Sequence, residues 1–381
     1  MKNLFLILPT ILLLFLNGCQ FIPKFYPVVG SDGTIYVTED KNLYALNSDK
    51  SLKWKYTARG HLSNNITLGK DNTVYVLGYK GDMYAINPEG NAKWISLYEK
   101  FSHDIPVVVR DSIIYVASGN ELCTMNLDKT INWKLSTKGK ILSSAFFDST
   151  GTLYVVSDNN LHAINPDGTE KWKFSIKIKA YTIPDVVIND STIYVESGTS
   201  LYALSFHGKV KWNKIYGEIF TIAGNDGTVC FGSGSSLYSL NADGKMKWRF
   251  IAKGKFYDTP VFGKDGTIYA NTDTTLYALN TDGTVKWSLN ISNSIQWLYI
   301  GNDETIYVIS HGPSFALNPD GTEKWSLFFA DGYFNFSPPA VDNNKNMYLG
   351  CEDGNLYAIK ADGTLNWRIS GSELNEFPLK R

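Results

Sequence analysis

The sequence predicts an all-β protein that closes into a single β-propeller. Three observations lead to this fold: a Trp-containing segment recurs nine times, the apolar residues around it alternate with period two, and Asp-Gly turns separate the alternating runs. The Trp residues lie 36 to 42 residues apart along the 381-residue chain. Four-stranded units repeated at about 40 residues are typical of propeller blades. The nine Trp residues are Trp54, Trp94, Trp133, Trp172, Trp212, Trp248, Trp287, Trp325 and Trp367.

Each repeat is predicted to form four antiparallel strands, and residues 259–289 show them in order. The first strand is a short apolar run with Pro, the second reads Thr-Ile-Tyr-Ala, the third Leu-Tyr-Ala-Leu-Asn, and the fourth begins at Lys-Trp. Asp265-Gly266 closes the first turn and the Asn280 to Gly283 segment closes the third. Asn and Asp bond their own backbone at such corners, and Gly takes the positive φ that ends the turn. The Trp is placed to pack on the adjacent blade.

The N-terminus predicts export and lipid attachment. Lys2 precedes an apolar stretch from Leu4 to Leu16 that is too short to span a bilayer and suits a signal peptide. The sequence Leu-Asn-Gly-Cys at 16–19 resembles the lipobox of bacterial lipoproteins, with an ordinary secretory signal as the alternative. That resemblance implies that Cys19 carries diacylglycerol and acyl chains such as palmitate, and Gln20 implies the periplasmic face of an outer membrane if the organism has one.

The expected organisation is therefore a signal peptide with lipobox at 1–18, a lipidated N-terminus and tether at 19–24, and a propeller at 25–381. The five residues from Gln20 to Lys24 reach on the order of 17 Å when extended. The propeller is then held close to the membrane.

Charge and cysteine usage exclude some function classes. The formal net charge is −1 and no basic run is present, so nothing indicates binding to nucleic acid or electrostatic attraction to an anionic membrane. Cys123, Cys230 and Cys351 lie in different, non-adjacent repeats, and the first two replace a repeat Tyr. We therefore expect no disulfide and a monomeric propeller.

The Ala-x-Asn-x-Asp-Gly-x-x-x-Trp segment resembles the repeat of PQQ (quinoprotein dehydrogenase-like) propellers. It is most similar to the non-catalytic, BamB-type lipoproteins of that family. The resemblance extends over about residues 25–370 and implies a propeller usually of eight blades, whereas nine units are present here. Nine blades are favoured, with eight as the alternative.

The residues do not indicate an enzyme. The adjacent Cys-Cys pair, calcium-binding set and catalytic Asp that the resemblance to the dehydrogenases would require are not found, and the five His are scattered, with His162 replacing a repeat Tyr. No metal, cofactor or catalytic residue is predicted. The favoured function is a membrane-anchored scaffold that binds other envelope proteins. The alternatives are a PQQ-dependent dehydrogenase and a small-ligand or glycan-binding propeller.

A binding face is expected where the loops vary, because binding residues concentrate in variable loops on a rigid scaffold. These loops are the links between repeats and the turns between second and third strands. Aromatic and polar residues there would ring the channel mouth and suit a protein interface, or would simply plug the channel. The candidate residues are His61, Asn64, His103, Asp104, Tyr181, Tyr257, Asp258, Gln296, Trp297, Tyr333 and Phe336.

Overall fold

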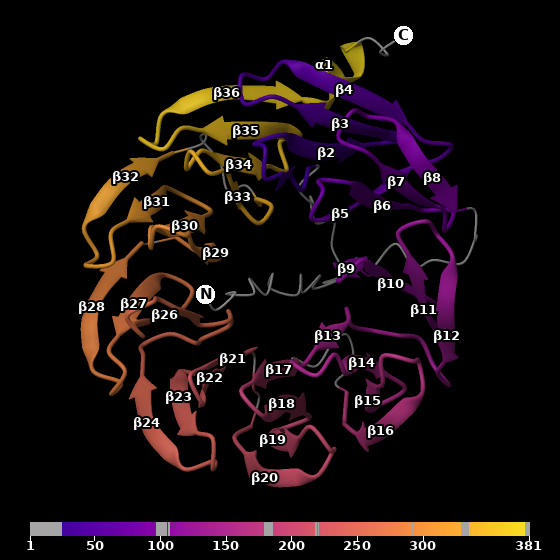
Figure 1. Ribbon diagram of the computed structural model, residues 1–381. Helices are drawn as coiled ribbons and strands as arrows, with labels where there is room; N and C mark the ends of the chain where they lie inside the picture. Colours follow the sequence, from indigo (N-terminus) through magenta and orange to yellow (C-terminus); the bar gives the residue numbers. More distant parts are fainter. Residues whose placement is uncertain are drawn as a thin grey trace.

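The computed structural model is a closed ring of nine four-stranded antiparallel sheets (Figure 1). Each sheet is a blade of four strands that follow one another in sequence, the first nearest the ring axis and the fourth at the outer edge. The all-β fold and the count of nine blades are confirmed. The structure describes residues 25–96, 105, 107–178, 186–217, 219, 221–291, 293–328 and 335–377.

The strands are given blade by blade, from the inner to the outer strand. Blades 1 to 3 contain β1 (Val28–Val29), β2 (Ile35–Glu39), β3 (Asn42–Leu46) and β4 (Leu52–Thr57); β5 (Leu62–Leu68), β6 (Val74–Gly78), β7 (Met83–Ile86) and β8 (Ala92–Ser96); β9 (Val108–Arg110), β10 (Ile113–Ser118), β11 (Glu121–Asn126) and β12 (Ile131–Ser136). Blades 4 to 6 contain β13 (Phe146–Phe147), β14 (Leu153–Ser157), β15 (Asn160–Ile164) and β16 (Glu170–Ser175); β17 (Val186–Asn189), β18 (Thr192–Ser197), β19 (Ser200–Ser205) and β20 (Val210–Ile215); β21 (Thr221–Asn225), β22 (Thr228–Ser233), β23 (Ser236–Asn241) and β24 (Met246–Ile251). Blades 7 to 9 contain β25 (Val261–Phe262), β26 (Ile268–Asn271), β27 (Thr275–Leu279) and β28 (Val285–Asn290); β29 (Ile295–Ile300), β30 (Ile306–Ser310), β31 (Ser314–Leu317) and β32 (Glu323–Leu327); β33 (Ala340–Val341), β34 (Met347–Gly350), β35 (Asn355–Ile359) and β36 (Leu365–Ser370).

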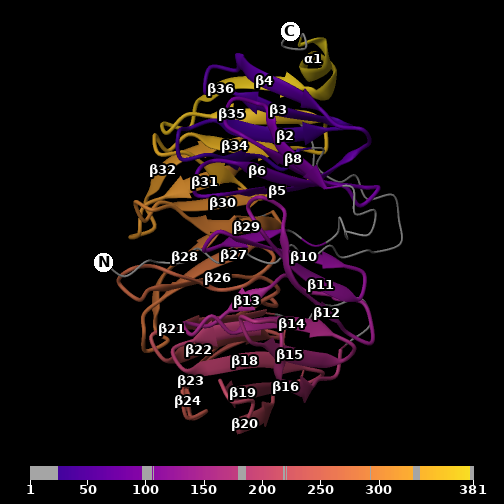
Figure 2. The same ribbon diagram turned by 45° about the vertical axis from the view of Figure 1, so that its right-hand side comes forward.

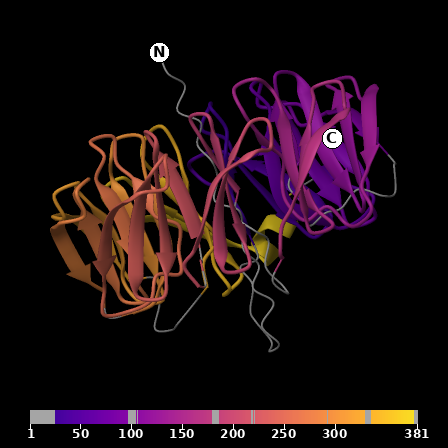
Figure 3. The same ribbon diagram turned by 90° about the horizontal axis from the view of Figure 1, so that it is seen from below.

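The ring has two rims of loops that differ in character. Seen from its edge, the strands run between these rims (Figure 3), and the turned view shows neighbouring blades stacked along the ring (Figure 2). Because each blade is an antiparallel meander, its first and third turns lie at one rim, which we call the uniform rim. The second turn of each blade and the links between blades lie at the other, which we call the variable rim.

The repeat Trp joins each blade to the next one. Trp54 pairs across the sheet with the small residue Ala45, and its indole Nε1–H donates to the carbonyl of Pro88 in the third turn of blade 2, at 2.7 Å. The ring lies over Gly90, whose φ is +87° and where an added Cβ would come within 2.6 Å of the indole. The motif is thus explained: Ala makes room beside the Trp, and Gly provides the surface on which the Trp of the preceding blade packs.

The same bond to the next blade recurs around the whole ring. The remaining indole donors and carbonyl acceptors are Trp94 to Leu127, Trp133 to Pro166, Trp172 to Phe206, Trp212 to Ala242, Trp248 to Thr281, Trp287 to Pro319, Trp325 to Ala361 and Trp367 to Ser48. The last bond joins blade 9 to blade 1 at 2.8 Å and shows that all nine repeats belong to one closed ring.

Two of the nine third turns depart from the expected Gly. Lys50 and Lys129 occupy its position in blades 1 and 3, yet they keep its positive φ, at +75° and +67°. A side chain in the left-handed region is unfavourable by about 1–2 kcal/mol. The fold therefore imposes the turn conformation even where the residue opposes it.

We expect Gly90→Ala to destabilise the ring more than Gly33→Ala. Both glycines have φ near +80°, but nothing lies within 4 Å of a Cβ added at Gly33, whereas a Cβ at Gly90 would meet the Trp54 ring. Gly33→Ala should lower the free energy of unfolding by about 1–2 kcal/mol, the cost of the backbone conformation. Gly90→Ala should add about 1–3 kcal/mol of overpacking. Thermal unfolding of the two variants gives the comparison, and equal losses would show that the glycine surface is unimportant for Trp docking.

A C-terminal helix, α1 (Gly371–Glu376), closes the seam between blades 9 and 1. Because only strands were predicted from the sequence, this helix was not anticipated. Ser370 and Glu373 form a capping box: the Glu373 N–H donates to the Ser370 hydroxyl, and the Ser370 N–H donates to the Glu373 carboxylate. This Ser-x-x-Glu spacing is a known signal for the start of a helix, and it can be read directly from the sequence.

Side chains of α1 bind blade 1 directly. The Asn375 side-chain oxygen accepts hydrogen bonds from Tyr44 at 2.8 Å and Asn42 at 3.2 Å, and Glu373 pairs with Lys50 at 3.1 Å. Leu374 is fully buried in a cluster that contains Phe25 and residues of blades 1 and 9. The seam is therefore closed by packing and side-chain bonds, since no strand is exchanged between these two blades.

The core consists of nine apolar clusters, most of them shared between neighbouring blades. Cys123, Cys230 and Cys351 are buried and free, so the prediction of no disulfide holds for the cysteines that the structure describes. His162 is buried, as expected for a residue in place of Tyr, and its Nδ1 lies 2.8 Å from Glu170. In the described part of the chain, no helix is long and apolar enough to cross a membrane.

Candidate functional site

The predicted binding residues fall at three separate blade junctions of the variable rim. Of the described candidates, His61 and Asn64 lie at the entry to blade 2, and Tyr257 and Asp258 lie at the entry to blade 7. Gln296, Trp297 and Phe336 lie at the junction of blades 8 and 9. His103, Asp104, Tyr181 and Tyr333 lie outside the described residues, as does the predicted lipidation site Cys19.

The junction of blades 8 and 9 brings Gln296, Trp297 and Phe336 together. The Trp297 indole donates to the carbonyl of Phe336 at 2.7 Å, and the Phe336 N–H donates to the Gln296 side-chain oxygen at 3.0 Å. Gln296 also donates to Asn335 at 2.9 Å, and Asn335 donates to Glu352 at 2.6 Å. These bonds fix the last residues of the link before β33.

Trp297 therefore has a structural role that could not be predicted from its position in the sequence. It stands on an inner strand, outside the Trp repeat, yet like the repeat Trp residues it donates to a backbone carbonyl of the next blade. Phe336 is buried among residues of both blades. A binding surface here would consist of the polar side chains around these two rings, with Glu352 and His311 at its edge; His311 Nε2 lies 3.3 Å from Asn335.

At the entry to blade 7, the Asp258 carboxylate accepts a hydrogen bond from a residue of the same blade. The Asn271 amide donates to its carboxylate at 2.6 Å, while burial and the nearby Asp273 raise its pKa to about 6. Burial is the larger cause, and the Asn271 hydrogen bond opposes it. This carboxyl group thus changes charge at mildly acidic pH.

We expect Asp258→Asn to stabilise the protein at neutral pH and to lose that advantage in acid. Because the folded-state pKa is raised above the ordinary value, the folded protein binds the extra proton between about pH 4 and 6, and wild-type stability falls as pH rises through this range. The difference in unfolding free energy between the two proteins should change by about 1–3 kcal/mol from pH 4.5 to 7.5. Denaturant unfolding at several pH values measures it. A difference that does not change with pH would contradict the burial of this carboxylate.

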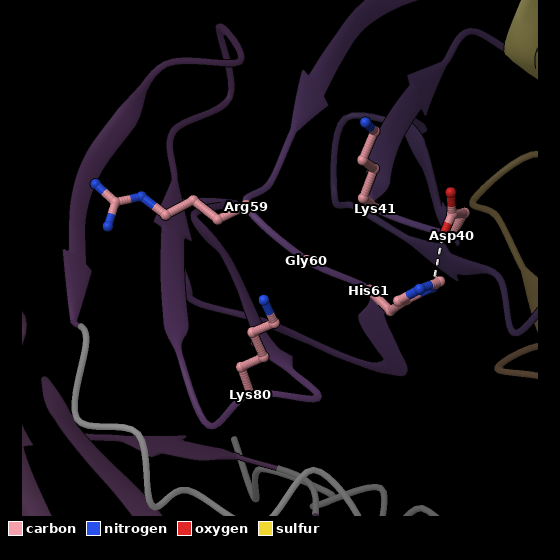
Figure 4. Close-up of a pocket in the computed structure, with 6 residues that line it drawn as sticks. All are labelled: Asp40, Lys41, Arg59, Gly60, His61 and Lys80. Carbon is pink, nitrogen blue, oxygen red and sulfur yellow. Dashed lines mark ion pairs between the residues drawn. The ribbon is translucent and has the colours of Figure 1, made fainter.

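A basic groove at the junction of blades 1 and 2 was not anticipated from the sequence. It is lined by Asp40, Lys41, Arg59, Gly60, His61 and Lys80 (Figure 4). His61 faces Asp40, with its Nδ1 at 2.5 Å from the carboxylate, while the three cationic side chains extend separately from the backbone. The three cations lie about 20 residues apart in sequence, so no basic run marks them.

Two features of the described residues bear on possible chemistry. No three His, Cys, Asp or Glu side chains among them come together as a metal site would require. Burial raises the pKa of the Cys230 and Cys351 thiols to about 12 and also raises that of Cys123, so all three are protonated and unreactive at neutral pH. What the geometry provides is a rigid ring with a varied set of polar, aromatic and charged side chains along one rim.

A protein-family profile described as outer membrane protein assembly factor BamB matches residues 23–128 and 212–308, together just over half of the chain. Among curated proteins, an 83-residue stretch is 31% identical to the uncharacterized protein YxaL of Bacillus subtilis (strain 168). That match covers 21% of this chain and 20% of YxaL, so the chain spans about a fifth of that relative.

Solved structures with the same fold include BamB from Moraxella catarrhalis, with a TM-score of 0.56 and 15% identity over 79% of this chain and 94% of that one. AztD from Citrobacter koseri has a TM-score of 0.52 and 11% identity, covering 92% of this chain and 95% of its own. The dihydro-heme d1 dehydrogenase NirN has a TM-score of 0.54 and 12% identity, covering 80% and 73%. At these identities the likeness is one of fold.

Proposed function

The chain belongs to the family of the outer membrane protein assembly factor BamB, and we propose that it is a non-catalytic scaffold that binds other proteins in the cell envelope. The observation that carries this proposal is the contrast between the two rims. The ring is rigid and repetitive, while its side-chain variety is concentrated along one rim. Varied loops on a rigid scaffold are where binding residues concentrate.

The uniform rim repeats one set of contacts. In the third turns of blades 3, 4, 7, 8 and 9 an Asp carboxylate accepts from the backbone and hydroxyl of the Thr two positions later, as Asp282 does from Thr284 and Asp320 from Thr322, each hydroxyl at 2.6 Å. These Asp residues serve the turns. The variable rim instead differs from blade to blade. It presents the basic groove at blades 1 and 2, Asp258 with the nearby Asp273 at blade 7, and the hydrogen-bonded side chains of Gln296, Asn335 and Glu352 at blades 8 and 9.

The proposal includes attachment to a membrane through lipid on Cys19 and a location at the periplasmic face of an outer membrane where one exists. It rests on the lipobox and on the family. The expected result is that Cys19→Ser moves the protein from the membrane to the soluble fraction and removes labelling by a palmitate analogue. Retention of both in that variant would contradict the anchor.

Binding of envelope proteins is tested by chemical cross-linking of intact cells followed by capture of the lipidated protein. We expect a small set of partners that are recovered reproducibly and that weaken when Cys19→Ser releases the protein from the membrane. Capture of no partner above background would count against a scaffold.

The absence of catalysis is tested separately by titration with PQQ and calcium while Trp fluorescence is followed. The expected result is no saturable change. Saturable binding together with dye-linked oxidation of an alcohol or a sugar would replace the scaffold by a dehydrogenase.

A further inference from the structure

We propose that the basic groove at blades 1 and 2 binds the phosphate groups of anionic lipids and orients the ring on the membrane. The cations come from three loops that meet only in the fold. Lys41 stands in the second turn of blade 1, Arg59 in the link to blade 2, and Lys80 in the second turn of blade 2. Their side chains are exposed and line one groove (Figure 4).

The groove is expected to bind anions because its positive charges are not neutralised by carboxylates of the protein. Within the described residues, no carboxylate pairs with Lys41, Arg59 or Lys80, and the one carboxylate of the groove, Asp40, is engaged by His61 at 2.5 Å. Guanidinium and ammonium groups at one site are the usual ligands of phosphate.

Lysines of the uniform rim behave differently. The Lys before the repeat Trp forms an ion pair with an Asp in the first turn of its own blade, with Lys53–Asp32 at 2.9 Å, Lys93–Asp71 at 3.1 Å and Lys286–Asp265 at 3.0 Å.

Because the molecule as a whole carries a net charge of −1, attraction to an anionic surface must come from a local group of cations and not from its total charge.

The position of the groove fits a membrane more directly than a soluble ligand. The chain enters the ring at Phe25, which packs against Gly350 at the end of β34, and therefore at the variable rim, beside blade 1. Five residues separate Phe25 from Cys19 and span at most about 20 Å. This step rests on the lipid anchor proposed above, which would hold the variable rim, and with it the groove, at the headgroup layer.

An exposed Tyr beside the groove supports the same occupant. Tyr79 is 57% exposed and precedes Lys80 in the same turn. Tyr side chains are enriched at the membrane interface, where the ring meets apolar chains and the hydroxyl remains in water. The groove itself is lined by charged residues and Gly60 and offers no apolar seat for a peptide side chain.

The test uses the mature chain from residue 19 with Cys19→Ser, so that lipid attachment plays no part and failure of the anchor cannot mask the result. Its ring is closed by its own residues through the Trp367–Ser48 bond. Co-sedimentation is measured with vesicles of phosphatidylcholine and with vesicles of equal parts phosphatidylcholine and phosphatidylglycerol. We expect binding to the second and not the first, decreasing with salt.

The triple variant Lys41→Gln, Arg59→Gln, Lys80→Gln should bind the anionic vesicles roughly 100-fold more weakly, since each Lys or Arg at an anionic surface contributes about fivefold. The matched control is Lys138→Gln, Lys177→Gln, Lys253→Gln, which removes three exposed cations from other links of the same rim. It should retain most of the binding. Equal loss in both variants, or no preference of the parent protein for anionic vesicles, would overturn the proposal; unchanged circular dichroism shows that the variants fold.

Discussion

Trp54→Ala is expected to lower the free energy of unfolding by about 3–5 kcal/mol, as for other buried aromatic side chains cut to Ala. The Trp54 ring is 2% exposed and packs over Gly90 in the next blade, and its indole bond to Pro88 is 2.7 Å long. Removing it opens a cavity between two blades and leaves a turn carbonyl without its donor. Thermal and denaturant unfolding followed by circular dichroism measure the loss.

The companion variant Trp54→Phe separates the two contributions. It keeps an aromatic ring over Gly90 but loses the indole N–H, so about 1 kcal/mol of the loss should be due to the hydrogen bond. A Trp54→Ala variant as stable as the parent would show that blades are held by their other contacts and that the repeat Trp is dispensable.

Leu374→Ala should cost about 2–5 kcal/mol and should loosen the ring at one place. Leu374 is fully buried in the cluster that joins α1 to blades 9 and 1. Each blade is built from consecutive strands, so this seam has no exchanged strand to support it. Hydrogen exchange should therefore accelerate in blades 1 and 9 before it does so elsewhere.

Glu376→Ala is the control for this variant, because Glu376 is exposed on the same short helix. Its stability should stay within about 0.5 kcal/mol of the parent. If hydrogen exchange in Leu374→Ala became faster evenly over all nine blades, α1 would not act specifically at the seam between blades 9 and 1.

The repeat could be predicted in detail because its signals are local. The Asp-Gly turns, the packing of each Trp on the adjacent blade and the period-two strands all act within or between adjacent blades, and the structure shows them where expected. The number of blades needed one long-range fact, the bond from Trp367 to Ser48, which closes the ring at nine rather than eight.

Other features depend on contacts that sequence spacing does not report. Lys41, Arg59 and Lys80 become neighbours only when three loops converge, so a search for basic runs could not find their groove. The described members of the predicted binding face lie at three junctions of the variable rim, and their role in binding stays a prediction. The missed helix is different, because its Ser370 and Glu373 capping signal was readable.

The most direct test of a scaffold that works through its variable rim is photo-cross-linking in living cells from two positions of similar exposure. Tyr257 is 42% exposed on the variable rim, and Val285 is 47% exposed at the uniform rim. A photoreactive residue at Tyr257 should give discrete adducts with envelope proteins, identified by mass spectrometry, while the same residue at Val285 should give none. Adducts from Val285 alone, or from neither position, would contradict a scaffold that binds its partners through the variable rim.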